Sequence, residues 1–205
     1  MTRKAENAKG DPPRFAKASF DIVAIASSAG GLTALTKLLS TLPKNFPAAI
    51  ALVQHLAPQH RSLMSEILAR HTALKVKQAE EDDCLTPGTV YIAPPDYHLL
   101  VNSDGTLSLS QSKLVNYLRP SADLLFASVA ATYKDRAIAI VLTGTGKDGA
   151  KGVQAIHKMG GTVIAQDQKS SEFPGMPNAT INTGNVDFIL PLDEISPTLV
   201  SLVMK

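Results

Sequence analysis

The sequence predicts an α/β fold, a doubly wound three-layer sandwich with a mostly parallel sheet and a β-hairpin insertion. Continuous apolar runs of strand length alternate along the chain with segments whose apolar residues recur at helical spacing. The apolar runs lack the polar alternation of a half-exposed strand, which indicates strands that are buried on both faces of a parallel sheet. In the middle of the chain, two short alternating runs flank Ser103-Asp104-Gly105, a pattern typical of a hairpin.

The first half of the chain supplies two pairs of a strand and a helix. We expect a strand over residues 22–26 and a helix over 31–42, which Pro43 ends because a proline ring cannot continue a helix. A second strand follows over 48–53 and a second helix over 60–71. The side chains expected to face the core from this second helix are Leu63, Met64, Ile67 and Leu68.

The alternation resumes after the hairpin insertion. The sequence predicts a helix over residues 121–133, with Ser121 as its N-cap residue. Because helices and strands alternate again, we expect the later strands to extend the same parallel sheet. The remaining predicted strands cover residues 137–142, 162–165 and 186–190, and the remaining predicted helices cover 149–159 and 197–204.

Length and composition favour one domain in a reducing compartment. With 205 residues, 44% of them hydrophobic, the chain is long enough for one sizeable core. Its single cysteine, Cys84, excludes an internal disulfide and a cysteine-based zinc site. The chain has neither the roughly 18 consecutive apolar residues of a membrane span nor the apolar core of a signal peptide. We therefore expect a cytoplasmic protein with no direct membrane insertion.

The charge pattern gives no support for nucleic-acid binding. The formal net charge is only +2, and the cationic residues are concentrated near the N-terminus. We therefore expect residues 1–19 to be a disordered tail and a single domain to cover residues 20–205. A metal site is not expected either, because the histidines beyond the second strand lack the spacing of metal ligands. Those histidines are His60, His71, His98 and His157.

A glycine-rich loop raises the possibility of a dinucleotide site. Gly144, Gly146 and Gly149 satisfy the G-x-G-x-x-G pattern between a predicted strand and a predicted helix, and Asp167 follows the next strand. Asp148 argues against this interpretation, because its carboxylate would lie in the turn that must approach a pyrophosphate. The pattern also normally opens its domain, whereas here several strand and helix units precede it.

Reactive side chains follow three of the predicted strands. The first strand ends at Ser27 and Ser28, the second at His55, and the strand over 137–142 leads to Asp148. The carboxyl ends of parallel strands meet at one edge of a sheet, where ligands bind. A hydroxyl, an imidazole and a carboxylate at that edge are the groups that a nucleophile, its base and an orienting acid require.

Each of these residues also has an interpretation without catalysis. A serine before Gly-Gly is commonly a helix cap or a turn residue. A single histidine after a strand is commonly structural, and Asp148 could cap the helix expected from residue 149. The catalytic interpretation gains weight from the coincidence of all three residue types at one edge of the sheet.

Six motifs in order resemble the catalytic domain of the chemotaxis protein-glutamate methylesterases, the CheB family. They are IASSAGG, VQHLAP, LTPGTVYIAPPDYHLL, RPSADLLF, LTGTGKDGAKG and GMPNATINTGNVDFILP, and the resemblance runs from about residue 21 to the C-terminus. It implies a serine hydrolase that removes methyl esters from glutamate side chains of methyl-accepting chemotaxis receptors and releases methanol, with glutamine deamidation as a possible second activity. By position, Ser28 matches the nucleophile, His55 the general base and Asp148 the acid that orients the base.

The resemblance also implies the partners and the domain content. We expect receptor cytoplasmic helices as partners, a monomer, no cofactor and no metal. The catalytic domain over 20–205 would stand without the receiver domain that familiar members carry ahead of it. Arg119 in RPSADLLF either assists substrate docking or is a surface residue at a helix start. Two other functions stay open at this point, a dinucleotide-binding Rossmann-like protein and a receptor-docking module without catalysis.

Overall fold

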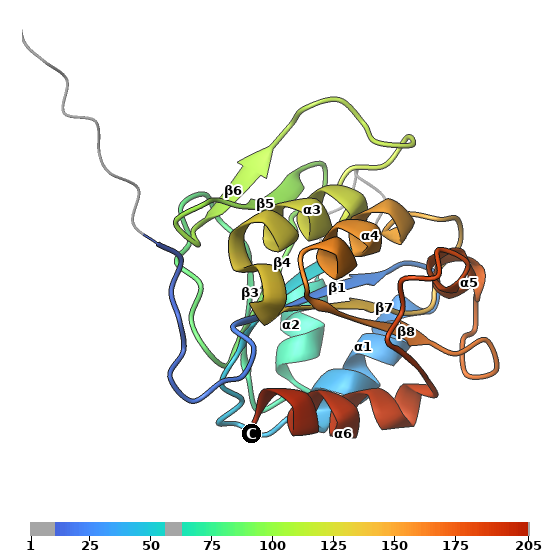
Figure 1. The fold of residues 1–205 in the computed structure, drawn as a ribbon, viewed down its shortest axis with the longest axis horizontal. Helices are drawn as coiled ribbons and strands as arrows, with labels where there is room; N and C mark the ends of the chain where they lie inside the picture. Colours follow the sequence, from blue (N-terminus) through green and yellow to red (C-terminus); the bar gives the residue numbers. More distant parts are fainter. Residues whose placement is uncertain (1–10, 56–62, 205) are drawn as a thin grey trace, which may run out of the picture.

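The computed structural model describes residues 11–55 and 63–204, which form a doubly wound α/β domain (Figure 1). The described strands make one seven-stranded sheet in the order β3-β4-β2-β1-β7-β8-β9, and every neighbouring pair is parallel. A separate antiparallel hairpin joins β5 to β6. The predicted fold class, including its hairpin insertion, is confirmed.

The elements follow one another in the predicted alternation. The strands are β1 (Ile22–Ser27), β2 (Ala49–Gln54), β3 (Lys75–Gln78), β4 (Thr89–Ile92), β5 (His98–Val101), β6 (Leu107–Ser110), β7 (Ala137–Val141), β8 (Thr162–Gln166) and β9 (Phe188–Leu190). The helices are α1 (Gly31–Ser40), α2 (Met64–Ala69), α3 (Ala122–Tyr133), α4 (Ala150–Lys158), α5 (Gly175–Ile181) and α6 (Leu192–Val203), with a 3-10 turn, η1, over Lys134–Arg136.

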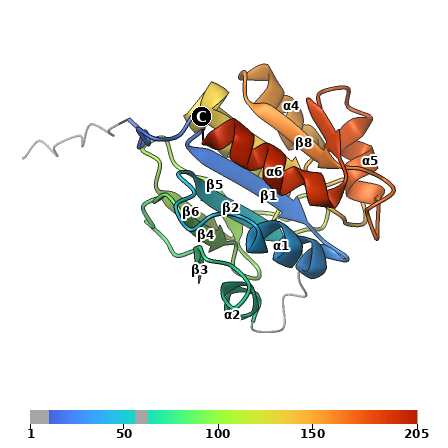
Figure 2. The same ribbon diagram turned by 90° about the horizontal axis from the view of Figure 1, so that it is seen from below.

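Helices cover both faces of the sheet. Figure 1 shows α3 and α4 on one face, and Figures 1 and 2 show α1 and α6 on the other. The central strand β1 is buried on both sides because its side chains alternate between two cores. Ala24 and Ala26 face the α3 and α4 side, whereas Val23 and Ile25 face the side of α1, α2 and α6. Ala24 and Ala26 share their core with buried side chains of α3.

The order of the strands defines where a ligand would bind. From β1 the chain builds the sheet outward through β2, β4 and β3, then returns to place β7 on the other side of β1. The loops that follow β1 and β7 therefore separate in opposite directions. In open α/β sheets such a topological switch point leaves a crevice at the carboxyl ends of the strands.

The predicted start of the C-terminal helix is wrong. A helix was expected over 197–204, but α6 begins at Leu192 and contains Pro197. Asp193 and Glu194 lie in its first turn, where carboxylates favour the positive end of a helix. Pro197 thus lies inside α6, and the helix begins five residues earlier than expected.

Three further details differ from the expectation. In the second predicted helix, residues 60–62 lie outside the described residues, and Leu63 is 52% exposed instead of facing the core. Met64 and Leu68 of α2 are buried as expected. The short edge strand β3 and the seven-residue helix α5 were not predicted.

The segment before β1 contacts the domain. Phe15 packs against the core on the α3 side, and its amide donates a 2.8 Å hydrogen bond to Asp21 Oδ1. Arg136, just before β7, donates to the same carboxylate at 2.5 and 2.7 Å. Residues 1–10 lie outside the described residues, so the disordered tail stays a prediction. None of the helices in the described parts of the chain is long and apolar enough to cross a membrane.

Candidate active site

Ser28 stands at the turn between the central strand and the first helix. Its amide donates to Thr143 O at 3.1 Å, and its carbonyl accepts from Gly31 N at 2.8 Å. Gly30, the residue before α1, has a φ of 73°, a left-handed conformation that glycine adopts without steric cost. Gly30 thus lets the chain turn from strand to helix immediately after Ser28.

Gln54, at the end of β2, joins the two strands that carry Ser28 and His55. Its Oε1 accepts a 2.6 Å hydrogen bond from Ser27 Oγ. Its Nε2 donates to Ser28 O at 2.7 Å and to His55 O at 3.2 Å. A Cβ at position 31 would collide with this amide, so the contact requires glycine at position 31.

His55 follows Gln54 and points toward the loop after β7. Its backbone amide donates to Ser27 O at 3.1 Å, which continues the ladder between β1 and β2. Its Nε2 lies 2.8 Å from Asp148 Oδ2, and its side chain is 11% exposed. A carboxylate can only accept, so the proton of this bond is on Nε2 and Nδ1 is left with a free lone pair in the neutral ring.

Asp148 is a buried carboxylate with both oxygens occupied by donors. Burial alone would raise the pKa of its carboxyl, but hydrogen bonds from His55 and two backbone amides outweigh burial and lower that pKa. Asp148 is therefore ionised at neutral pH. The donors are His55 Nε2 (2.8 Å), Ser121 Oγ (3.0 Å), Ala122 N (2.7 Å), Asp123 N (3.1 Å) and Gly149 N (3.1 Å).

The first turns of α3 and α4 cap one another. Asp148, which precedes α4, accepts from the amides that open α3. In return, Asp123 of α3 accepts from Gly149, Lys151 and Gly152 of the α4 turn at 2.9, 3.0 and 2.9 Å. Burial raises the pKa of Asp123 despite these three amides. The interpretation of Asp148 as a cap of its own helix is therefore mostly wrong, since it chiefly caps the neighbouring one.

Ser121 and His98 extend this network away from Asp148. Ser121 occupies the predicted N-cap position of α3, but its hydroxyl donates to Asp148 instead of accepting from the helix. Its amide donates to His98 Nδ1 at 3.1 Å. His98 is fully buried, and because Nδ1 accepts, its Nε2 carries the proton and donates to Lys113 O at 3.2 Å. Sequence reasoning missed both roles.

Ser28, His55 and Asp148 line one cavity. Its volume is about 510 Å³, and Thr145 and Lys147 also contribute to its wall. Within the described part of the chain, Ser28 Oγ has no hydrogen-bond partner, so it is available to a ligand in the cavity. The three residues singled out by the sequence thus lie together at the switch point of the sheet.

The glycine-rich loop has structural reasons for its glycines. A Cβ on Gly144 would lie 2.8 Å from Ser28 Cβ, and Gly149 has a φ of 97° where α4 begins. Asp167, the candidate ribose ligand, accepts from the amide and the hydroxyl of Ser170 and closes its own turn. The geometry therefore gives no support to the dinucleotide interpretation.

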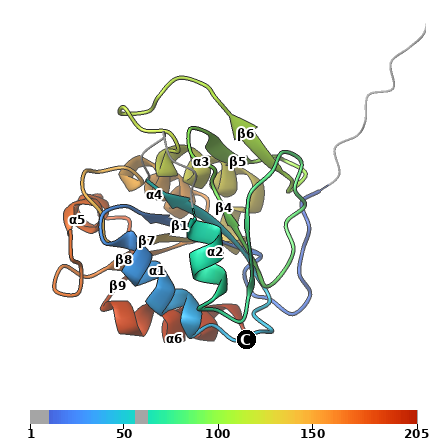
Figure 3. The same cartoon turned by 180° about the vertical axis from the view of Figure 1, so that it is seen from behind.

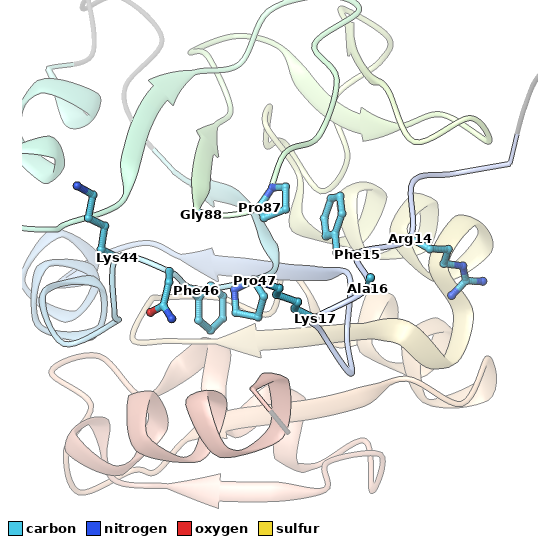
Figure 4. A pocket seen from close by; sticks show the side chains of 10 residues that line it. Arg14, Phe15, Ala16, Lys17, Lys44, Phe46, Pro47, Pro87 and Gly88 are labelled. Carbon is cyan, nitrogen blue, oxygen red and sulfur yellow. The ribbon is translucent and has the colours of Figure 1, made fainter.

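A second cavity lies near the opposite, amino-terminal edge of the sheet. Its volume is about 430 Å³, and Figure 4 shows Phe15, Phe46 and Pro47 among the side chains that line it, with Lys17 and Lys44 at its border. It contains no hydroxyl, thiol, imidazole or carboxylate from the described residues. Also within the described residues, no three histidine, cysteine or acidic side chains gather as metal ligands would.

The fold and the site together define a class of protein. A doubly wound parallel sheet with a hydroxyl, an imidazole and a buried carboxylate in one crevice is typical of α/β hydrolytic enzymes. The family model described as CheB methylesterase matches residues 23–199. The chain therefore belongs to the CheB methylesterase family.

Three similar proteins show how far the likeness extends. The crystal structure of the Thermotoga maritima CheB methylesterase catalytic domain matches with a TM-score of 0.86 at 41% identity, over 90% of this chain and 99% of that one. The protein-glutamate methylesterase FrzG of Myxococcus xanthus is 40% identical over 199 residues, which are 97% of this chain and 58% of FrzG. A relative from Leptospira interrogans is 38% identical over 184 residues, covering 90% of this chain and 95% of its own length.

Proposed function

We propose that Ser28, His55 and Asp148 hydrolyse the γ-methyl esters of glutamate side chains on methyl-accepting chemotaxis receptors. The observation that carries this proposal is the 2.8 Å bond between His55 and a buried, ionised Asp148 in the cavity that Ser28 lines. Membership in the CheB methylesterase family and the likeness to the protein-glutamate methylesterase FrzG support the same substrate class.

The first half of the reaction transfers the acyl group to Ser28. Ser28 Oγ attacks the ester carbonyl carbon while Nδ1 of His55 takes the hydroxyl proton. Asp148 holds the proton on Nε2 and stabilises the imidazolium that forms. The bond from carbon to the methoxy oxygen then breaks, His55 returns the proton to that oxygen, and methanol leaves an acyl-enzyme.

The second half regenerates the serine. A water molecule gives a proton to His55 Nδ1 and attacks the acyl carbon, and the bond to Ser28 Oγ breaks as His55 protonates it. The product is a glutamate side chain. A glutamine would form the same acyl-enzyme with ammonia as the leaving group, so the site also accounts for the deamidation in the names of relatives from Caulobacter and Thermotoga.

Backbone amides near Ser28 would stabilise the oxyanion of the tetrahedral intermediates. The amide of Gly31 is already bonded to Ser28 O, so it is not available. The amides of Ala29 and Thr145 have no acceptor within the described residues, and both residues lie beside the cavity or its nucleophile. We assign these two amides as the oxyanion donors, close to the positive end of α1.

One assay tests the proposed function. The purified protein is incubated with a methylated cytoplasmic receptor fragment, and released methanol is measured with Ser28→Ala as the control. Methanol from the wild type alone supports the proposal. Receptor binding without methanol would indicate a docking module, and a melting temperature raised by NAD would indicate the dinucleotide alternative.

We further propose that the protein acts in the cytoplasm, on receptor helices, as a monomer.

A further inference from the structure

The chain between β6 and α3 forms a loop beside the catalytic cavity. This rim loop, residues 111–119, stands clear of the helical layers in Figures 1 and 3. Tyr117 and Leu118 line the cavity that contains Ser28 and His55. The same two rim-loop residues also line an adjoining cavity of about 310 Å³. The rim loop therefore borders the place where the ester would react.

The tip of the rim loop is a tight two-residue turn that contains a tyrosine, Tyr117, which is unusual in such a turn. Val115 and Leu118 exchange backbone hydrogen bonds of 3.1 and 2.9 Å across it. Between them, Asn116 and Tyr117 have φ values of 49° and 66°. Such a turn is normally filled by Asn-Gly, because both central residues adopt the left-handed conformation. Asparagine tolerates that conformation, but tyrosine adopts it rarely.

The side chain of Tyr117 contributes nothing to the core. It is 94% exposed, and Leu114 of the same loop is 52% exposed. Backbone conformations of this kind persist mainly at functional sites. Tyrosine side chains are enriched at binding interfaces. Neither the turn nor the fold accounts for a tyrosine here, whereas a role in contacting a partner does.

The base of the rim loop is held firmly to the domain. Arg119 Nε and Nη2 donate to Asp96 Oδ1 at 3.0 and 2.7 Å. Its Nη1 donates to the carbonyls of Gln111 and Ser112 at 3.0 and 2.9 Å, at the other end of the loop. The guanidinium is thus occupied by Asp96 and by two carbonyls of the loop. Arg119 is a positioning residue, and the expectation that it docks substrate is not supported.

We propose that the rim loop is the surface that recognises the receptor helix, with Tyr117 as its main contact. This inference rests on the proposed function. A glutamyl ester that reaches Ser28 brings the residues three and four positions away on the same helix face toward the rim of the cavity. Leu114, Tyr117 and Leu118 present apolar surface there. The occupant is therefore a helix with apolar side chains flanking the esterified glutamate, as in other recognition of amphipathic helices.

Two substrates with the same scissile bond test this proposal. One is a methylated receptor cytoplasmic fragment, and the other is glutamate γ-methyl ester blocked by an acetyl group and an α-amide. Methanol release gives kcat/KM for each. For Tyr117→Gly we expect the ratio of the receptor value to the small-ester value to fall about tenfold or more. The melting temperature should not fall, because glycine suits the turn better than tyrosine.

Two variants serve as controls. Lys134→Gly removes an exposed side chain from another position with a positive φ, 53°, at the far end of α3 from the cavity. It should leave the ratio unchanged. Tyr117→Phe keeps the aromatic ring and should stay within about twofold of the wild-type ratio.

Three results would overturn the proposal, and they are distinguishable. Wild-type kcat/KM values on both esters in Tyr117→Gly would reject recognition by the rim loop and leave the proposed function intact. An equal loss on both substrates shows that the loop serves the chemistry instead of recognition. A wild-type protein that hydrolyses neither ester, or a Ser28→Ala protein that hydrolyses both, rejects the proposed function and this inference with it.

Discussion

Ser27 and Ser28 are adjacent hydroxyls with different surroundings. Ser27 is fully buried and bonded to Gln54, whereas Ser28 borders the cavity. Ser28→Ala should abolish methanol release and change the free energy of unfolding by less than about 0.5 kcal/mol, because no buried contact is lost. Methanol release and urea denaturation measure the two effects.

The neighbouring variant provides the matched control. Ser27→Ala leaves Gln54 Oε1 without its donor, which should cost about 1–3 kcal/mol of stability. Activity per folded molecule should largely survive. The reverse pattern, with activity lost in Ser27→Ala and kept in Ser28→Ala, would show that the nucleophile has been assigned to the wrong serine.

Asp148 requires two acceptor oxygens, since donors face both of them. Asp148→Asn places an NH₂ group against a donor, so we expect a loss of about 1–3 kcal/mol in stability. The imidazole of His55 also loses its fixed tautomer, which in comparable triads lowers kcat about ten-thousandfold. Urea denaturation and methanol release at neutral pH test both expectations.

The depressed pKa of Asp148 adds a pH dependence to this comparison. A carboxyl whose pKa is lower in the folded state stabilises the fold above its unfolded pKa of about 3.9 and loses that contribution as pH falls through the folded value. The stability gap between wild type and Asp148→Asn should therefore shrink as pH is lowered from about 5 toward 2. A constant gap would contradict the assigned ionisation.

At the scale of the element, the loop after β7 shapes the nucleophile turn. Gly144→Ala would place a Cβ 2.4 Å from Met176 Sδ and 2.8 Å from Ser28 Cβ, so both Met176 and the Ser28 turn would have to shift. A displacement of about 1 Å can cost about 100-fold in rate, and we expect kcat to fall by that order. Single-turnover methanol release measures it.

Gly146→Ala is the control in the same loop. Gly146 has a φ of +85°, but a Cβ there meets nothing within 4 Å. We expect a loss of about 1–2 kcal/mol in stability from the left-handed backbone, with a much smaller effect on kcat than Gly144→Ala. Equal kinetic effects would show that crowding against Ser28 is not what Gly144 avoids.

The sequence predicted which residues line the site better than the hydrogen bonds that hold them. Strand ends are visible as apolar runs that stop at polar residues, so Ser28, His55 and Asp148 could be placed at one edge of the sheet. Their joint catalytic role stays a prediction. Gln54 ended an otherwise apolar strand, a signal that was present but not used. The capping of α4 by Asp123 depends on how α3 packs beside α4, which no local pattern records.

The N-terminal extent of α6 shows a different limit. Asp193 and Glu194 after Pro191 form a helix-start signal, but Pro197 provided a second one nearby. Only the packing of α6 beside α1 decides between them. At the level of the whole chain, alternation of strands and helices was enough to define the fold class, because the order of elements leaves few topologies for a parallel sheet.

On the scale of the whole molecule, Asp21 ties together the amino-terminal ends of the two central strands. Asp21 directly precedes β1, and its fully buried carboxylate pairs closely with Arg136 before β7 and more loosely with Arg14 at 3.4 Å. Arg136→Ala leaves a buried carboxylate without its main partner, so we expect the free energy of unfolding to fall by about 3 kcal/mol. Urea denaturation measures this loss.

Arg14→Ala is the matched control on the same carboxylate. Arg14 is half exposed, and its removal should cost less than about 1 kcal/mol. Because Asp21 lies at the opposite end of β1 from Ser28, methanol release per folded molecule should stay unchanged in both variants. A kinetic defect in the folded Arg136→Ala protein would show that the two ends of the sheet are coupled.

The side-chain amide of Gln54 has a consequence for thermal motion. It forms hydrogen bonds with the Ser27 hydroxyl, the Ser28 carbonyl and the His55 carbonyl. When β1 and β2 move relative to each other, these hydrogen bonds couple Ser28 to His55. The distance between the two residues should therefore change less than the distance between the strands. Asp148 is held instead by the first turns of α3 and α4. Movement of these helices relative to the sheet would therefore first change the orientation of the His55 imidazole.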